Sequence, residues 1–188
     1  MGAATLSGPL VRRQPWRGGA GRGEILPAMS PREPVQRRHL LPGATPAEVY
    51  AVVTDFDVYP RLFPEIKSTR VLETSGPRVR VEFRAQIVMP IRYVLDLVCD
   101  AQKHVVDWTF VEGEIVTDSI GGWRLSGEGD GTAIDYRVSI ELKAPVPGFV
   151  LRKVTDGLVA ASLPNMFAAI DREVRRRQGL ETSGLPET

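Results

Sequence analysis

Few residues of this 188-residue chain have the types and spacing that catalysis or metal binding needs. Its two histidines, His39 and His104, are isolated, and we interpret His104, which follows a predicted turn, as an edge histidine rather than a general base. Cys99 falls on the apolar face of a predicted strand, where a buried structural cysteine is the usual case. As the single cysteine it excludes an internal disulfide, and a reducing compartment is the simpler assumption.

Two segments resemble chemical motifs only superficially. Glu112, Glu114 and Asp118 cluster around one predicted turn, but metal sites recruit histidine or several converging oxygens, so solvated carboxylates are preferred to a metal or acid/base set. Residues 127–131, Gly-Glu-Gly-Asp-Gly, lie between two predicted strands and not before a helix, so we expect a hairpin turn and no phosphate loop. Common zinc and nucleophile motifs are also absent from the sequence. We therefore predict no catalytic residue, no metal ion and no cofactor.

Four aromatic residues fall on inward-facing positions of predicted strands, namely Tyr93, Trp108, Trp123 and Tyr136. Each carries one polar atom that needs a partner if the ring is buried. Under one interpretation these rings fill the core. Under the other they line a pocket and offer hydroxyl or indole donors to an apolar ligand, which is the usual make-up of a small-molecule site. Both interpretations remain open at this point.

The composition fits an ordinary soluble globular protein, with 43% hydrophobic residues. The 24 basic and 23 acidic residues leave a net charge of +1, so we expect no nucleic-acid partner. No stretch approaches the ~18 apolar residues that a membrane span needs. We expect a cytoplasmic protein, with peripheral membrane contact as an open alternative.

The two ends of the chain differ from its middle. Residues 1–33 are rich in Gly, Pro and Arg without a hydrophobic period, which predicts a disordered tail, translated from upstream of a true start at Met29. The alternative is an organelle-targeting segment, because four arginines precede the first acid, Glu24. We expect one domain over 34–178 and a C-terminal tail over 179–188.

Seven segments are predicted as strands from apolar and polar alternation, which is clearest where Val79, Val81 and Phe83 alternate with charged residues. Paired glycines, Gly121 and Gly122, predict a bulge or sharp bend. The predicted strands are 36–41, 67–74, 79–87, 91–99, 104–111, 115–126 and 132–142.

Helices are predicted on either side of the strand series. Thr45 and Glu48 form a capping box that starts a helix over 46–54, and a short helical turn follows at 59–62. Residues 149–177 repeat apolar residues at helical spacing and predict one long helix. The fold class is therefore α+β, with a curved antiparallel sheet around a long C-terminal helix. One helix with many small residues cannot fill the volume that seven strands enclose, so we expect an apolar pocket between them.

Three pieces of sequence carry a family resemblance: residues 53–64, Val-Thr-Asp-Phe-Asp-Val-Tyr-Pro-Arg-Leu-Phe-Pro; Val111-Glu-Gly113 with Gly122-Trp-Arg-Leu125; and residues 147–149, Pro-Gly-Phe. On these, residues 35–177 resemble the START-like (SRPBCC, Bet v 1-like, helix-grip) superfamily, and within it the polyketide cyclase/dehydrase and coenzyme Q-binding group. The chain departs from that pattern at Leu62-Phe63, which reverses the usual order, and at Glu65-Ile66, where coenzyme Q-binding members tend to have Trp-Cys.

The resemblance implies a pocket for a lipid, an isoprenoid quinone or another polycyclic apolar molecule, entered near residues 56–64. We expect a protein that binds such a molecule, with transfer or chaperoning as its use. The expected walls, with Phe63 near the mouth, are Phe63, Phe83, Ile87, Tyr93, Leu95, Trp108, Phe110, Trp123, Tyr136, Val138, Leu158 and Met166.

Two other functions remain as alternatives. A polyketide-type aromatase/cyclase or dehydratase would need polar residues inside the pocket, and the candidates are Arg92, Asp96, Asp107 and Asn165; the strand register points the first three outward. A partner-binding regulator, like the ribosome-associated toxins of this group, has the arginine cluster at 172–177 as its only hint, and a solvated helix end explains that cluster equally well.

Overall fold

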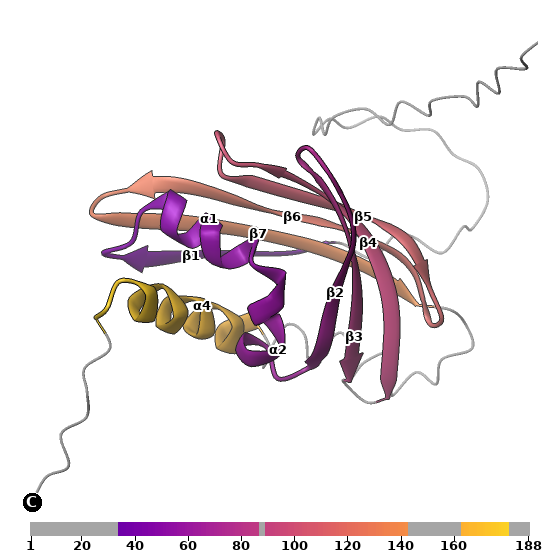
Figure 1. Cartoon of the computed structure of the whole chain (residues 1–188). Coiled ribbons are helices and arrows are strands. Elements are labelled where there is room, and N and C mark those ends of the chain that lie inside the picture. The colour runs from indigo at the N-terminus through magenta and orange to yellow at the C-terminus, as the bar shows by residue number, and fades with distance from the viewer. Residues whose placement is uncertain (1–33, 87–88, 143–162, 181–188) are drawn as a thin grey trace, which may run out of the picture. The chain divides into compact units, whose positions relative to one another are not determined.

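A computed structural model describes residues 34–86, 89–142 and 163–180 of the chain. Within them, one seven-stranded sheet carries three α-helices and a short 3-10 helix (Figure 1). The strands are β1 (Val35–Pro42), β2 (Ile66–Ser75), β3 (Arg78–Gln86), β4 (Pro90–Asp100), β5 (Val105–Gly113), β6 (Val116–Glu128) and β7 (Gly131–Leu142). The helices are α1 (Pro46–Val53), η1 (Phe56–Val58), α2 (Tyr59–Leu62) and α4 (Leu163–Arg177).

Every neighbouring pair of strands is antiparallel, and the order in the sheet is β1-β7-β6-β5-β4-β3-β2. Strands β2 to β7 therefore follow one another as hairpins, whereas β1 pairs with the last strand of the chain. The predicted fold class, an α+β helix-grip arrangement with seven antiparallel strands and a C-terminal helix, is confirmed. The inward faces of the strands supply most of the core, and Val81, Val106 and Ile134 are fully buried there.

Helix α1 starts as the sequence predicts. Thr45 is the N-cap: its Oγ1 accepts a hydrogen bond from the Glu48 backbone N–H at 3.3 Å, and the Thr45 N–H donates to Glu48 Oε2 at 2.7 Å. These reciprocal bonds satisfy two backbone donors that a helix start otherwise leaves unpaired. The helix buries Val49, Val52 and Val53, and it contacts β6 and β7.

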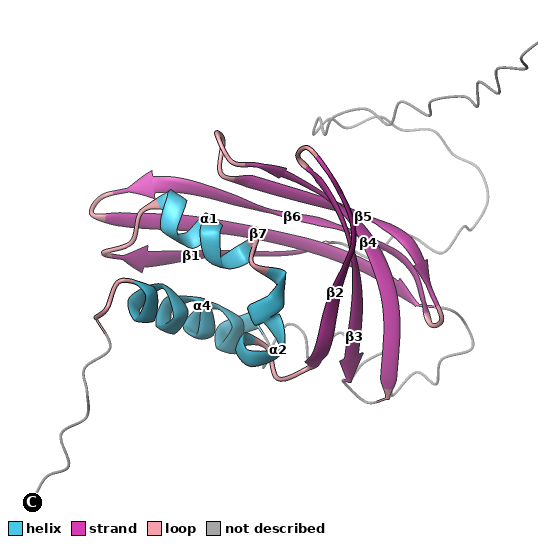
Figure 2. Cartoon of the chain, in the orientation of Figure 1, coloured by secondary structure: helices cyan, strands magenta, loops and turns pink. Residues whose placement is uncertain are grey.

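The C-terminal helix closes the domain on the same side of the sheet as α1 and α2 (Figure 2). The predicted helix over 149–177 is helical in its described part, Leu163–Arg177; its first half lies outside the described residues. Phe167, Ile170 and Val174 recur at helical spacing and are buried. The helix packs against α1 and α2, so these three elements together form the helical side of the domain.

The paired glycines of β6 do not form the predicted bulge. Pairing with β7 runs without a break through Gly121 and Gly122, and the register shift lies instead between Val116 and Asp118. A Cβ at Gly121 would overlap the Trp108 ring on β5 and a backbone carbonyl of β7. Gly121 is thus required for the close approach of the indole ring, and a bulge is not its role.

Among the described helices, none combines the length and apolar character needed to cross a membrane.

Candidate functional site

A cavity of about 210 Å³ lies between the inner face of the sheet and the helical segments. Strands β2 to β7 line it on one side, and α2, the loop after it and the first turn of the described part of α4 line it on the other. The lining is mostly apolar and aromatic because strand alternation directs Phe83, Leu95 and Val138 inward. A cavity of this composition suits a hydrophobic small molecule.

Nine of the twelve residues expected as walls line the cavity: Phe63, Phe83, Tyr93, Leu95, Trp108, Trp123, Tyr136, Val138 and Met166. Phe110 is not among the described residues that line it. Its half-buried ring packs on the core and lies close to Gly113 of the same strand. Ile87 and Leu158 lie outside the described residues.

Several further residues line the cavity without having been named as its walls from the sequence, although Asn165 was considered as a polar candidate. Ala85, Ile91, Leu97 and Ile140 stand on the inward register of strands that the alternation had already located, so their positions followed from the same signal. Another group lies at the ends of strands, in the segment around α2, on β6 and on α4, and was not named as a wall from the sequence. This group comprises Tyr59, Leu62, Pro64, Glu65, Ile66, Val116, Ser119 and Asn165.

Aromatic rings pack against one another around the cavity. Phe83 and Tyr93 stack with centroids 5.3 Å apart and planes 10° from parallel. Trp123 and Tyr136 lie 4.4 Å apart, tilted by 47°. Tyr59 meets Phe63 edge-on at 4.9 Å. Such pairs fix ring orientation, so the walls of the cavity are preformed.

The cavity wall carries hydroxyl and indole groups, and Glu65 and Asn165 add a carboxylate and an amide. Tyr59 Oη donates to the backbone carbonyl of Val53 at 2.6 Å, and Trp108 Nε1 donates to Ser119 Oγ at 3.3 Å. Burial raises the pKa of Tyr93 to about 12, and burial together with the nearby Tyr93 also raises the pKa of Tyr136. These phenols are therefore neutral at physiological pH.

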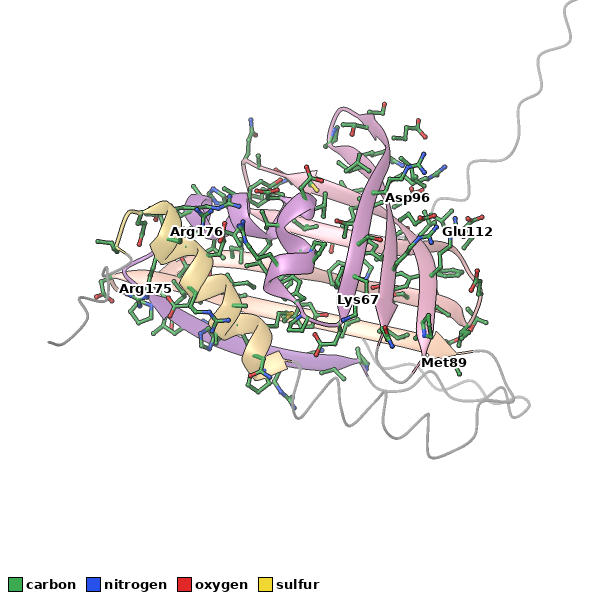
Figure 3. All side chains as sticks on the ribbon, turned by 60° about the horizontal axis from the view of Figure 1, so that its bottom comes forward. Lys67, Met89, Asp96, Glu112, Arg175 and Arg176 are labelled. Atoms are coloured by element: carbon green, nitrogen blue, oxygen red, sulfur yellow. The ribbon has the colours of Figure 1, made fainter. Side chains whose placement is uncertain are left out.

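The charged residues considered for catalysis lie in ion pairs on the other face of the sheet. Arg92 donates to Glu82 at 2.6 Å and to Glu112 at 2.9 Å. Asp96 accepts from Arg80 at 2.6 Å, and this hydrogen bond lowers the pKa of the Asp96 carboxyl. Figure 3 shows Asp96 and Glu112 on the strands away from the helices.

Two more of the candidate polar residues are placed by the structure. Asp107 accepts from Arg124 at 2.6 Å, so it too is held in an ion pair outside the cavity. Asn165, on α4, lines the cavity. The outward register expected for Arg92, Asp96 and Asp107 agrees with these contacts.

The histidines are outside the cavity. His39 stacks on Phe167 with centroids 4.8 Å apart, joining β1 to α4. His104 lies in the turn before β5 with a positive φ of 51°, and its ring meets Tyr50 edge-on at 5.9 Å. In the described part of the chain, no three His, Cys, Asp or Glu side chains are grouped to hold a metal ion.

The curved antiparallel sheet, the C-terminal helix packed on it and the cavity between them are those of the START/Bet v 1-like class of helix-grip proteins. The chain belongs to the family described as polyketide cyclase / dehydrase and lipid transport, whose family model matches residues 35–174. A comparison with curated protein sequences gives no significant match.

Similar solved structures share the fold at low sequence identity. The Zhui aromatase/cyclase of Streptomyces sp. R1128 is 17% identical, with a TM-score of 0.68 over 78% of this chain and 95% of that one. A START superfamily protein of Mycobacterium smegmatis is 20% identical, with a TM-score of 0.64 over 77% and 98%. A STAR-related lipid transfer protein of Xanthomonas axonopodis is 16% identical, with a TM-score of 0.60 over 79% and 89%.

Proposed function

We propose that this protein binds a hydrophobic small molecule, such as a lipid, an isoprenoid quinone or a polyketide-like compound, and holds it for transfer or protection without changing it chemically. The observation that carries the proposal is the cavity itself, a space of about 210 Å³ with mainly apolar and aromatic walls. Solved relatives with this fold include proteins named for lipid transfer and for aromatase/cyclase activity, which supports an apolar ligand.

Apolar contact alone accounts for retention of such a ligand. Each buried CH₂ group contributes about 0.8 kcal/mol, so a ligand with ten apolar carbons gains several kcal/mol before any polar contact is counted. Binding also has to offset the loss of translational freedom, which a preformed cavity keeps small because few side chains need ordering.

The proposal is tested by looking for the ligand and by blocking its space. Native mass spectrometry and solvent extraction of the protein from its own host should reveal a bound apolar molecule. Adding that molecule at about 100 times its Kd should stabilise the fold by about 2.7 kcal/mol, which is a shift of several degrees in Tm.

Ala85→Phe should abolish the Tm shift, because the larger side chain occupies the cavity that Ala85 lines. Ala101→Phe is the matched control, since Ala101 is exposed in the turn before β5. An extract without any apolar molecule, together with no Tm shift from a panel of lipids and quinones, would refute the proposal. Equal responses of the two variants would place the ligand outside the cavity.

The second candidate function is a cyclase or dehydratase, and the position of Asn165 on the cavity wall favours it. Arg92, Asp96 and Asp107 do not add to it because each is held in an ion pair elsewhere. If the protein converts a poly-β-ketone substrate to a cyclised product, Asn165→Leu should reduce that rate at least tenfold and Asp107→Asn should leave it unchanged.

The arginine cluster at the end of α4, which was the hint for a partner-binding regulator, is engaged in ion pairs within the domain. Arg175, Arg176 and Arg177 pair within the domain, with Asp171, Glu173 and Asp55 respectively. Their charges are thus already matched inside the molecule, and an acidic partner would have to compete with these contacts.

A further inference from the structure

The aromatic hydrogen-bond donors of the cavity wall are of two kinds. Tyr59 and Trp108 are satisfied within the protein, by the Val53 carbonyl and the Ser119 hydroxyl. Tyr93 and Tyr136 also line the cavity, yet neither hydroxyl forms a hydrogen bond with any residue in the described ranges. Buried phenols in proteins normally have a partner. These two hydroxyls are therefore available to a molecule inside the cavity.

Neighbouring rings hold both phenols in place. Tyr93, on β4, is stacked on Phe83, and Tyr136, on β7, lies against Trp123 and Trp108, the latter 6.0 Å away. Strands β5 and β6 separate β4 from β7 in the sheet, so the two phenols approach the cavity from well-separated strands. Donors whose rings are already fixed lose little conformational freedom when they bind.

The two phenols without a partner among the described residues are neutral. Burial raises the pKa of both phenols, so each retains its proton near neutral pH and acts as an O–H donor. A carbonyl oxygen has two lone pairs and is able to accept from one or both of them.

The shape of the cavity points to a ring compound. Its walls present the faces and edges of aromatic side chains, which pack well on flat rings. Its volume of about 210 Å³ exceeds the roughly 150 Å³ of an apolar protein cavity that binds benzene. A ligand of about two fused rings is in keeping with that space.

We infer that the cavity selects a neutral, flat ring compound bearing a carbonyl oxygen, and that Tyr93 and Tyr136 recognise this oxygen by donating hydrogen bonds to it. The inference rests on the proposed function, since it concerns the same cavity. It adds a ligand class and the two residues that discriminate it: an apolar ring system alone fits the walls, but only the carbonyl compound satisfies the hydroxyls.

The test uses two compounds of nearly equal shape, 2-acetylnaphthalene and 2-isopropylnaphthalene, which differ by a carbonyl oxygen in place of a methyl group. Isothermal titration of the full-length protein should give about tenfold tighter binding for the ketone. Tyr93→Phe and Tyr136→Phe should each weaken ketone binding by about 3- to 10-fold, as expected for one hydrogen bond, and leave the hydrocarbon within about twofold.

Tyr50→Phe is the matched control, because Tyr50 contacts His104 and does not line the cavity. It should leave both affinities unchanged. A second measurement is independent of the variants: the infrared carbonyl stretch of the bound ketone should move to lower wavenumber than in hexane, as it does on accepting a hydrogen bond.

Equal affinity of the unmodified protein for the two compounds would overturn the inference and leave the proposed function standing. The same holds if both phenylalanine variants bind the ketone normally, or if its carbonyl stretch matches that in hexane. Binding of neither compound would also overturn it, and the proposed function would then be decided by whether the protein extracted from its host carries another apolar molecule.

Discussion

At the residue scale, the cavity phenols differ in whether the protein itself uses their hydroxyl groups. Tyr59 links α2 back to the end of α1 through the Val53 carbonyl, and its pKa is raised by burial, so the hydroxyl remains a donor. Tyr93 has no such link among the described residues. The same side chain is thus structural at one position and free for recognition at the other.

This difference gives a stability prediction for the protein without ligand. Tyr59→Phe should lower the free energy of unfolding by about 1–2 kcal/mol, because it removes a buried hydrogen bond and leaves the carbonyl unpaired. Tyr93→Phe is the control and should change stability by less than about 0.5 kcal/mol, since it removes a hydroxyl that has no partner. Urea unfolding measures both. Equal losses in the two variants would contradict the assignment.

Most of the cavity residues that the sequence indicated stand on regular strands, and Phe63 and Met166 are the exceptions. Period-2 alternation placed Phe83, Leu95 and Val138 inward, because a pleated strand leaves no other arrangement. Phe110 has the same alternation and pairs with Leu95, a cavity residue, yet it is not among the lining residues, and the alternation does not account for this. Asn165 was noticed as a polar candidate, yet its direction depends on how α4 packs, which the sequence pattern does not specify.

At the element scale, β5 and β6 pack closely because a tryptophan ring of β5 lies over a glycine of β6. Trp108 on β5 pairs across the sheet with Gly121 on β6, and its indole fills the space where a Cβ would stand. Paired glycines in a strand are typical of a bulge or of close approach, and the sequence alone did not distinguish the two. The distinction depends on the cross-strand partner, which becomes known only with the register.

Gly121→Ala should therefore destabilise the protein by about 1–3 kcal/mol, because the added methyl group would overlap both the Trp108 indole and a backbone carbonyl. Gly127→Ala is the control: it lies in the same strand, and nothing stands within 4 Å of its added Cβ. The control should be neutral or slightly stabilising, since alanine restricts the unfolded chain. Thermal unfolding followed by tryptophan fluorescence measures the stability of both variants. If Gly121→Ala leaves the stability unchanged, the Trp108 ring does not need a glycine at this position.

At the scale of the whole domain, one buried carboxylate joins the helical elements beside the cavity. Glu173 on α4 is only 3% exposed and accepts hydrogen bonds from Arg61 of α2 and from Arg176 and Arg177 of its own helix. Arg177 also reaches Asp55, just after α1. The position of α2, and with it one side of the cavity, is thus connected to α4 through charges.

This network predicts a specific acid sensitivity. The hydrogen bonds from Arg176 and Arg177 and the charge of Arg61 lower the pKa of Glu173 from 4.5 to about 2. Because the folded state then binds this proton less readily than the unfolded state, the stabilisation is complete above about pH 4.5 and is lost as the pH falls toward about 2. Urea unfolding across this range should show the loss.

Glu173→Gln should lower stability at neutral pH by about 1–3 kcal/mol and flatten the acid dependence between those pH values. Asp171→Asn is the control on the same helix: its pair with Arg175 is largely exposed, so a change below about 0.5 kcal/mol is expected. An unchanged pH profile in Glu173→Gln would show that other carboxylates govern acid unfolding.

The pairing of β1 with β7 has a consequence for how the protein is made. Arg38 and Asp135 face each other across this pair although 97 positions separate them in the chain. During translation the first strand emerges long before its only neighbour in the sheet, while β2 to β6 are already able to form hairpins. Closure of the sheet has to wait until β7 has left the ribosome. Until then, the hydrogen-bonding edge of β1 has no strand partner in its own chain and is open to pairing with another chain.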